Sequence, residues 1–333
     1  MPYPPMIDWS PFVELVRNND RFVLTTHVRP DCDALGSQLA MAEILQRANK
    51  QVLCCNAFCV PPNYRFVDPH GQSKQLGVEV SAEQLEGYDV LIVLDTTAWA
   101  QLGAMGEAVR RTALKKVVID HHVSGDELGA ELLKDTTAEA TGRLVIEAAD
   151  ALGVELTPGI AQNAFAAIAT DTGWFRFATA TSATHRLAAR LIDAGAAPAR
   201  LYKFLYEEET LARLKLIGRT LGRAQTEHNG QLIYTWLERS DFDQIGAVPS
   251  DSEDLINMTL TVGGTQVAVI LVEQVGGGFK VSFRSRCGLD CSQAARQFGG
   301  GGHKQAAGAF VDAPLEEARE QVLTAVRAAM QDV

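Results

Sequence analysis

The stretch Thr26–Gly36, THVRPDCDALG, follows directly on Arg21–Thr25, RFVLT, an apolar run that is typical of a buried strand. It contains a histidine and two aspartates, and unpaired carboxylates at the end of a buried strand are unstable unless a cation neutralises them. A segment with helical character, ALGSQLAMAEILQRANK, continues from residue 34 to residue 50. This order of strand, metal-binding side chains and helix predicts an α/β fold with a metal site at a strand end.

Further short apolar runs alternate with longer amphipathic segments over the first part of the chain. The runs are QVLCCNA at 51–57, DVLIVLD at 89–95 and KKVVIDHH at 115–122. Fully apolar strands that alternate with helices are typical of a parallel sheet covered on both faces. We therefore expect residues 1–195 to form a doubly wound, mainly parallel α/β domain.

The rest of the chain has a different pattern of apolar residues. Residues 196–226 carry apolar positions at helical spacing and predict a helical linker. From 227 to 333, the strand-like runs QLIYTWLE, TQVAVILVE and KVSFRSR precede a final amphipathic helix, PLEEAREQVLTAVRAAM. We expect a second, smaller α/β domain there, with an active-site cleft between the two domains.

Composition limits the classes of protein that this chain can belong to. The 333 residues are 47% hydrophobic, contain no apolar stretch of about twenty residues, and begin without the basic and apolar parts of a signal peptide. A cytoplasmic protein without a membrane segment is expected. The net charge of −11 argues against long nucleic acid as a partner, because such binding neutralises many phosphates with Lys and Arg.

The six cysteines are too few and too unevenly spaced for a disulfide framework. Cys54, Cys55 and Cys59 could hold zinc, but two of them are adjacent within an apolar run, where small buried thiols are the commoner outcome.

Candidate metal ligands stand at the ends of several predicted elements, and parallel strands bring their carboxyl ends to one edge of a sheet. Each residue alone is more commonly a helix cap, a turn residue or a structural histidine. Their joint occurrence favours a metal site. The residues are His27, Asp31, Asp33, Asp95, Asp120, His121, His122 and Asp171.

The charges of this set suggest how many ions it would hold. Asp31, Asp33, Asp95 and Asp171 supply four negative charges, which two divalent cations would neutralise. Two metal ions about 3.5–4 Å apart are a common device for cleaving phosphate esters. Histidine and aspartate without thiolate favour Mn²⁺, with Mg²⁺, Co²⁺ or Fe²⁺ as competitors.

Six motifs together resemble those of the DHH family of phosphoesterases, in the short two-domain group with a DHHA1 second domain. They are HVRPDCDALGS at 27–37, VLDTT at 93–97, DHH at 120–122, ATDTGWFRF at 169–177, VSFRSR at 281–286 and FGGGGHKQAAG at 298–308. The resemblance covers nearly the whole chain.

The resemblance implies roles for these side chains. One metal would be held by His27, Asp31 and Asp95, and the other by Asp33, Asp95, His121 and Asp171, with Asp95 as the bridge. His122 would face the substrate phosphate or the leaving group, and Asp120 would orient the site.

The second domain would bind the substrate. A glycine run lets backbone N–H groups approach a phosphate closely, and arginine offers a planar, bidentate donor. The expected substrate-binding residues are Arg284, Ser285, Arg286, Gly300, Gly301, Gly302 and His303.

The family implies hydrolysis of short oligoribonucleotides to mononucleotides, of 3′-phosphoadenosine 5′-phosphate (pAp) to AMP, or of both, by attack of a metal-bridging water. A homodimer is common in the family. Hydrolysis of cyclic or linear dinucleotides such as c-di-AMP and pApA is the main alternative. An inorganic pyrophosphatase, whose basic SRKKQ-type motif is absent here, and a catalytically silent nucleotide-binding regulator are weaker ones.

Three aromatic residues, Trp174, Phe175 and Phe177, follow Asp171 closely. They would either stack a base of the substrate or pack in the core beneath the site.

Overall fold

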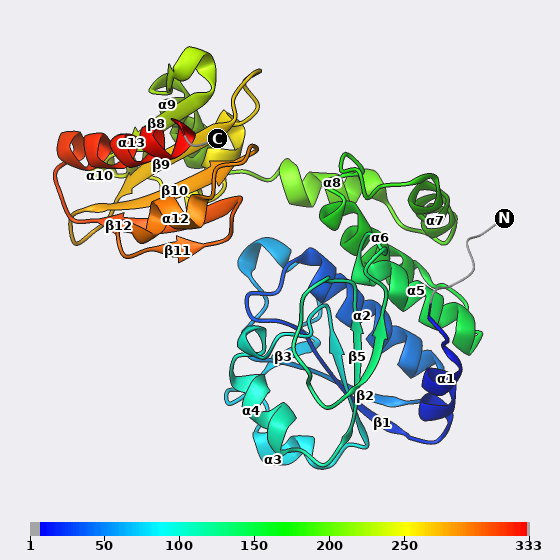
Figure 1. Ribbon diagram of the computed structural model, residues 1–333. Coiled ribbons are helices and arrows are strands. Elements are labelled where there is room, and N and C mark those ends of the chain that lie inside the picture. The colour runs from blue at the N-terminus through cyan, green and yellow to red at the C-terminus, as the bar shows by residue number, and fades with distance from the viewer. Residues whose placement is uncertain (1–6, 332–333) are drawn as a thin grey trace. The chain divides into compact units, whose positions relative to one another are not determined.

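The computed structural model of the chain describes residues 7–331 and forms two compact units that divide between Glu208 and Glu209 (Figure 1). The segment 196–226 contains two helices. Helix α8 (Pro198–Tyr206) belongs to the first unit, and α9 (Leu211–Gly222) begins the second.

The first unit is built on a six-stranded sheet in the order β3-β2-β1-β4-β5-β6. All of its strand pairs are parallel, which confirms the predicted fold class. The strand order reverses between β1 and β4, and in open α/β sheets ligands bind beyond the carboxyl ends of the strands at this reversal. The strands are β1 (Arg21–Thr25), β2 (Gln51–Asn56), β3 (Ser73–Gln75), β4 (Val90–Leu94), β5 (Lys115–Asp120) and β6 (Glu131–Lys134).

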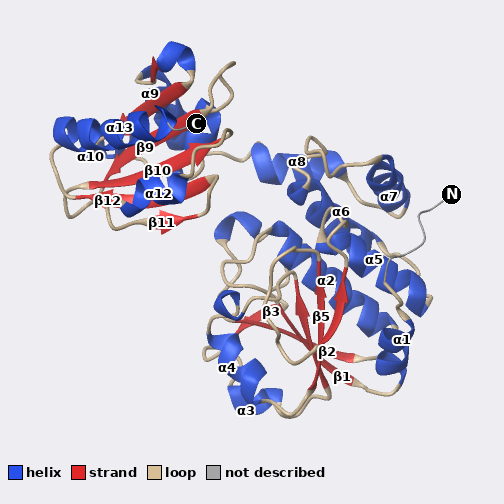
Figure 2. Ribbon diagram, viewed as in Figure 1, coloured by secondary structure: helices blue, strands red, loops and turns tan. Residues whose placement is uncertain are grey.

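Helices cover both faces of this sheet (Figures 1 and 2). Successive side chains of each strand point to opposite faces, so each strand contributes to two cores. Phe22 and Leu24 pack in one core and Val23 packs in the other. The first core includes α1 (Ser10–Arg17), α2 (Cys32–Arg47), α5 (Thr141–Leu152), α6 (Pro158–Asp171) and α7 (Ser182–Asp193). The second includes α3 (Ala82–Leu85) and α4 (Ala104–Arg111).

Helix α2 lies deep in the first core, and only a few of its residues reach solvent. Gly36 stands where α2 meets α6, and a Cβ added there would lie 2.5 Å from the carbonyl oxygen of Asn163. The glycine therefore sets how closely these two helices approach. That approach positions the first turn of α2 and the end of α6, and both carry candidate ligands.

The second unit contains a mixed sheet in the order β11-β12-β10-β9-β8-β7, in which only the β8–β9 pair is parallel among the described strands. Helices α12 and α13 pack on one face, and α9, α10 and α11 pack on the other. The strands are β7 (Gln225–Glu227), β8 (Leu232–Leu237), β9 (Val267–Glu273), β10 (Phe279–Ser285), β11 (Gly301–Gly302) and β12 (Ala306–Val311). The helices are α10 (Arg239–Ile245), α11 (Leu255–Thr259), α12 (Cys291–Arg296) and α13 (Leu315–Gln331).

Short 3-10 turns complete the described elements: η1 (Pro62–Tyr64), η2 (Trp99–Gln101), η3 (His228–Gly230) and η4 (Pro249–Ser252). Within residues 7–331, no helix combines the length and the apolar character that a bilayer crossing requires.

Candidate metal-binding active site

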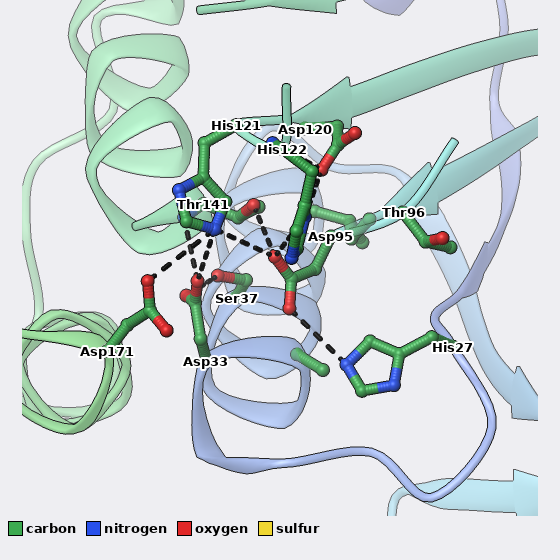
Figure 3. Close-up of polar contacts among 12 residues, drawn as sticks. His27, Asp33, Ser37, Asp95, Thr96, Asp120, His121, His122, Thr141 and Asp171 are labelled. Atoms are coloured by element: carbon green, nitrogen blue, oxygen red, sulfur yellow. Dashed lines mark hydrogen bonds and ion pairs between the residues drawn. The ribbon is translucent and has the colours of Figure 1, made fainter. Parts of the chain in front are cut away.

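The candidate ligands meet at the point where the strand order reverses. His27 lies two residues beyond β1, Asp95 follows β4 directly, and His121 follows β5 directly. Asp171 is the last residue of α6. These three strand ends, the start of α2 and the end of α6 bring together six side chains, here called the histidine–aspartate cluster: His27, Asp31, Asp33, Asp95, His121 and Asp171. All of them except Asp31 are labelled in Figure 3.

Both histidines of the cluster are oriented by backbone carbonyls. Nδ1 of His27 lies 2.9 Å from the oxygen of Val28, and Nδ1 of His121 lies 3.2 Å from the oxygen of Ala138. A ring nitrogen that donates to a carbonyl carries the proton, so a neutral ring keeps its lone pair on Nε2. Metal-ligating histidines are commonly held in this way.

Three carboxylates surround the Nε2 atom of His121. The nearest oxygens of Asp95, Asp171 and Asp33 lie 3.5, 3.6 and 3.7 Å from it. These distances are too long for hydrogen bonds. The four side chains converge on a shared space, as the ligands of one ion would.

A second group of ligand atoms surrounds His27. Its Nε2 lies 3.4 Å from Oδ2 of Asp95 and 3.9 Å from Oδ1 of Asp31. The structure thus brings together all six predicted ligands, in two groups that both adjoin Asp95. Their division between two ions remains a prediction.

Asp95 has an unusual backbone. Its φ of 64° is in the left-handed region, where residues other than glycine are uncommon and cluster at functional sites. Its N–H donates to the oxygen of Ile119 at 2.9 Å, and its Oδ1 accepts a hydrogen bond of 2.8 Å from the hydroxyl of Thr141. These contacts turn the carboxylate from the end of β4 toward both histidines.

Asp33 accepts three hydrogen bonds, two of them at the N-terminus of α5. The backbone N–H groups of Thr141 and Gly142 donate to it at 2.8 and 3.0 Å, and the hydroxyl of Ser37 donates at 3.0 Å. Thr141 and Gly142 were not predicted as site residues. The available signal was a small polar residue and a glycine just before the apolar run of α5, which marks a helix start.

Asp31 has two contacts. It is the N-cap of α2, where its Oδ1 accepts a hydrogen bond of 3.0 Å from the N–H of Ala34. The same oxygen faces His27. The helix-cap interpretation and the ligand interpretation are therefore compatible for this residue.

The electrostatics of the cluster favour bound cations. Burial raises the pKa of Asp33, and burial followed by the charge of Asp33 raises the pKa of Asp95 well above its ordinary value. The same two causes raise the pKa of Asp171 to about 6. Because these carboxylates repel one another in a poorly solvated space, divalent metal ions fit the cluster, and its oxygen and imidazole donors suit such ions.

His122 lies beside the cluster, with its Nδ1 3.8 Å from Oδ1 of Asp95, but its hydrogen bonds are to Asp120. Its Nδ1 donates to Oδ1 of the buried Asp120 at 2.8 Å, which is the main cause that raises the pKa of His122 to about 9. The other oxygen of Asp120 accepts a hydrogen bond of 3.0 Å from Thr97 and lies 3.3 Å from Nζ of Lys134. About half of the His122 side chain is exposed, so its Nε2 is available to a ligand.

Lys134 was not predicted as a site residue. It lies opposite Asp120 in the β5–β6 register, and its Nζ also donates to the hydroxyl of Thr97 at 3.1 Å and to the oxygen of Ser124 at 3.2 Å. Thr97 belongs to the VLDTT motif, but the sequence did not assign it a role.

The predicted substrate-binding residues of the second unit lie at one end of its sheet. Arg284 pairs with Ala306 in the β10–β12 register, and Ala306 exchanges backbone hydrogen bonds with His303. Ser285 is buried, and Nη1 of Arg286 donates to the oxygen of Leu260 at 2.7 Å.

The glycine run has a packing role, and its contact with substrate stays a prediction. A Cβ at Gly300 would lie 2.2 Å from the oxygen of Gly308, and one at Gly302 would lie 2.6 Å from the oxygen of Ala306. These two glycines therefore permit the close approach of the run to β12. Gly301 has open space where its side chain would be.

The aromatic residues after Asp171 differ in exposure. Trp174 and Phe175 are partly buried and pack against the first core, whereas Phe177 is exposed. Trp174 and Phe175 therefore flank the core without being fully buried in it.

Comparison with known proteins agrees with these features. Residues 21–168 match the DHH family, N-terminal domain, and residues 229–332 match the DHHA1 domain. A bifunctional oligoribonuclease and PAP phosphatase NrnA from Thermus thermophilus is 33% identical over 91% of this chain and 88% of its own length. The Bacillus subtilis protein of the same name is 30% identical over 90% of this chain and 92% of its own length.

A solved structure extends the likeness to the fold. An exopolyphosphatase-related protein from Bacteroides fragilis superimposes with a TM-score of 0.89 at 22% identity, over 98% of both chains. The matched domains, the relatives and the fold lead to one conclusion. The chain belongs to the DHH family of phosphoesterases, with a DHHA1 second domain.

Proposed function

We propose that this protein is a metal-dependent phosphoesterase that hydrolyses short oligoribonucleotides to mononucleotides and pAp to AMP. The observation that carries the proposal is the convergence of three carboxylates, 3.5–3.7 Å away, on the Nε2 atom of His121. The names of the relatives from Thermus thermophilus and Bacillus subtilis support this choice of substrates.

We assign the ligands to two ions. His27, Asp31 and Asp95 would hold one ion, and Asp33, Asp95, His121 and Asp171 would hold the other, with Mn²⁺ preferred over Mg²⁺, Co²⁺ or Fe²⁺. Such a pair supplies a nucleophilic water at neutral pH and neutralises charge that develops on the phosphate.

The other residues of the site would act on the substrate directly or through a neighbour. With Nδ1 bonded to Asp120, His122 can donate from Nε2 to a phosphate oxygen or to the leaving group. Asp120 would fix the tautomer and orientation of that ring, as carboxylates next to histidines commonly do.

We further propose that Arg284, Ser285, Arg286, the run Gly300–Gly302 and His303 bind the part of the substrate away from the scissile bond. The only hydrogen bond of the Arg284 side chain within the described residues is to the oxygen of Phe283, so most of its donors are available. His303 is exposed, and Gly301 has open space where a side chain would be.

A side-by-side turnover assay tests this proposal. With Mn²⁺ present, the protein is offered pAp, a short oligoribonucleotide, pApA, c-di-AMP and pyrophosphate at equal concentration. We expect the highest kcat/KM for pAp and the oligoribonucleotide, and no turnover of any substrate by Asp95→Asn. A clear preference for c-di-AMP or pyrophosphate would replace the proposed substrates, and no turnover of any substrate would refute the enzyme assignment.

A further inference from the structure

The turn that follows Asp171 is strained. Gly173, Trp174 and Phe175 are consecutive left-handed residues, with φ values of 56°, 58° and 62°. Bulky side chains rarely adopt this conformation, and such strain persists where the surrounding structure enforces it, commonly at functional sites. Here the N–H of Trp174 donates to the oxygen of Ala169 at 2.6 Å, and that of Phe175 donates to the hydroxyl of Thr172 at 3.0 Å.

The strained turn directs Trp174 against two tyrosines of α8. The ring centroid of Trp174 lies 5.1 Å from that of Tyr202 and 5.7 Å from that of Tyr206, and the two tyrosine rings are 4.9 Å apart. Trp174 also contacts Phe165 of the core, with ring centroids 6.1 Å apart. The tryptophan therefore packs against both the core and the two tyrosines.

The tyrosines present aromatic surface to solvent. Tyr202 is 39% exposed and Tyr206 is 45% exposed, and neither hydroxyl has a hydrogen-bond partner within residues 7–331. Tyrosines that only fill a core usually bury the ring and pair the hydroxyl. Exposed rings held firmly by a third ring are instead typical of a surface that stacks a planar ligand.

The turn after Asp171 connects this aromatic surface to the histidine–aspartate cluster. Trp174, whose ring contacts both tyrosines, stands only three residues after the candidate ligand Asp171. A ligand on the tyrosines would thus lie close to the end of α6 that carries this ligand.

A cation completes the surface. Nε of Arg176 donates to the oxygen of Gly173 at 2.7 Å, while its two terminal nitrogens have no hydrogen-bond partner within the described chain. Its guanidinium carbon lies 5.9 Å from the centroid of the Phe177 ring, and the bond to Gly173 holds Arg176 in the same turn as Trp174, which contacts both tyrosines. Guanidinium groups bind phosphate oxygens, and aromatic rings stack on bases, so the pair matches the two ends of a nucleotide.

We propose that Tyr202, Tyr206 and Arg176 form a nucleotide subsite beside the histidine–aspartate cluster, in which a base stacks on the tyrosine rings and Arg176 binds the phosphate of the same nucleotide. This inference rests on the proposed function, because it concerns the nucleotide unit of that substrate. It assigns base recognition to α8, outside the motifs that the sequence singled out.

The test compares AMP with ribose 5-phosphate, which lacks the base. Binding of each to the full-length protein with Mn²⁺ is measured by calorimetry, and AMP, as the proposed product, is not consumed. We expect AMP to bind roughly 5- to 150-fold more tightly, the range that stacking of one base provides. Equal affinities for AMP and ribose 5-phosphate would overturn the subsite.

Variants test which side chains cause the preference for AMP over ribose 5-phosphate. Tyr206→Leu should reduce the affinity for AMP toward that for ribose 5-phosphate and leave the latter unchanged, while the matched control Tyr206→Phe keeps the ring and the preference. Arg176→Gln should weaken both ligands by a similar factor. An unchanged AMP preference in Tyr206→Leu, as expected if another part of the protein or a second copy covers the rings, would refute the proposal.

A second measurement tests the subsite without the Tyr206→Leu variant, which could fail to fold. AMP should quench tryptophan fluorescence in the wild type and quench it much less in Trp174→Phe, and equal quenching in both would contradict the subsite. The outcomes also separate this inference from the proposed function. AMP binding that depends on Tyr206, without hydrolysis of any substrate, would support the subsite and refute the proposed enzymatic function. Hydrolysis without a preference for AMP over ribose 5-phosphate would support the enzymatic function and refute the subsite.

Discussion

Asp95 directs one carboxylate oxygen toward each of the two cluster histidines: its Oδ2 lies 3.4 Å from Nε2 of His27, and its Oδ1 lies 3.5 Å from Nε2 of His121. The residue occupies the end of β4, at the strand-order reversal, in a left-handed backbone conformation. This single carboxylate links the two groups of candidate ligands. A change that disturbs Asp95 should therefore affect both groups together.

Thr141→Val should weaken metal binding without removing a ligand. The hydroxyl of Thr141 donates to Oδ1 of the buried Asp95, and loss of such a supporting contact commonly lowers metal affinity or activity by about 10- to 100-fold. The Mn²⁺ concentration for half-maximal activity measures the effect. Thr137→Val is a matched control, because that hydroxyl bonds to Asp135, outside the cluster. Equal Mn²⁺ requirements in both variants would contradict this role of Thr141.

Lys134→Met should lower kcat and leave the Mn²⁺ requirement near that of the wild type. Lys134 contacts Asp120, Thr97 and the oxygen of Ser124, and through Asp120 it positions His122. We expect a loss of at least about tenfold, part of the 10²–10⁴ that a general acid contributes. Lys134→Arg should restore part of the rate. A raised Mn²⁺ requirement with unchanged kcat would show that Lys134 acts on the metal ligands instead.

In the metal-free protein, Asp171 should contribute less to stability as the pH rises from about 4 to about 6. The pKa of Asp171 is raised from 3.8 to about 6, so between these values the folded state binds more protons than the unfolded state, and its stability falls with rising pH. In EDTA, Asp171→Asn should therefore melt above the wild type at pH 7, and the difference should shrink toward pH 4.

Asp89→Asn is a control in this experiment, because its melting temperature should change in the opposite direction. Hydrogen bonds from Arg21 lower the pKa of Asp89, so its contribution to stability is present at neutral pH and is lost as the pH falls. That variant should melt below the wild type at pH 7. A lower melting temperature for Asp171→Asn at pH 7 in EDTA would contradict the predicted repulsion among the cluster carboxylates.

Gly36→Ala should destabilise the first unit. The new methyl group would lie 2.5 Å from the oxygen of Asn163, and such overpacking typically costs about 1–3 kcal/mol. Gly218→Ala is the matched control on α9, because nothing lies within 4 Å of the new Cβ, and alanine should stabilise that helix by about 0.5–1 kcal/mol. Urea unfolding measures both changes. Equal unfolding midpoints for the two variants would show that the α2–α6 contact can relax.

The sequence predicted the parallel sheet and the location of the cluster for a physical reason. Short apolar strands define a doubly covered sheet, and side chains that follow strands such as β1, β4 and β5 must meet at one edge. His27, Asp95 and His121 could therefore be placed together from the order of residues along the chain.

The supporting residues could not be predicted in this way, because their contacts depend on register and on local backbone geometry. Lys134 meets Asp120 only through the pairing of β6 with β5. Thr141 reaches Asp95 only because α5 begins against the end of β4. The left-handed turn at Trp174 could not be predicted either, because tryptophan disfavours that conformation. The contact of Trp174 with Tyr202 and Tyr206 depends on this turn and was therefore also not predicted.

The most direct test of the central claim measures bound metal and hydrolysis on the same samples. Wild type and Asp95→Asn are equilibrated with Mn²⁺, freed of excess ion, analysed for metal content and assayed with pAp. Two ions per wild-type chain with Mn²⁺-dependent release of AMP, together with lost metal and no detectable turnover in Asp95→Asn, are the predicted result. Metal content in Asp95→Asn equal to that of the wild type, or a wild type that binds no divalent ion and releases no AMP, would contradict it.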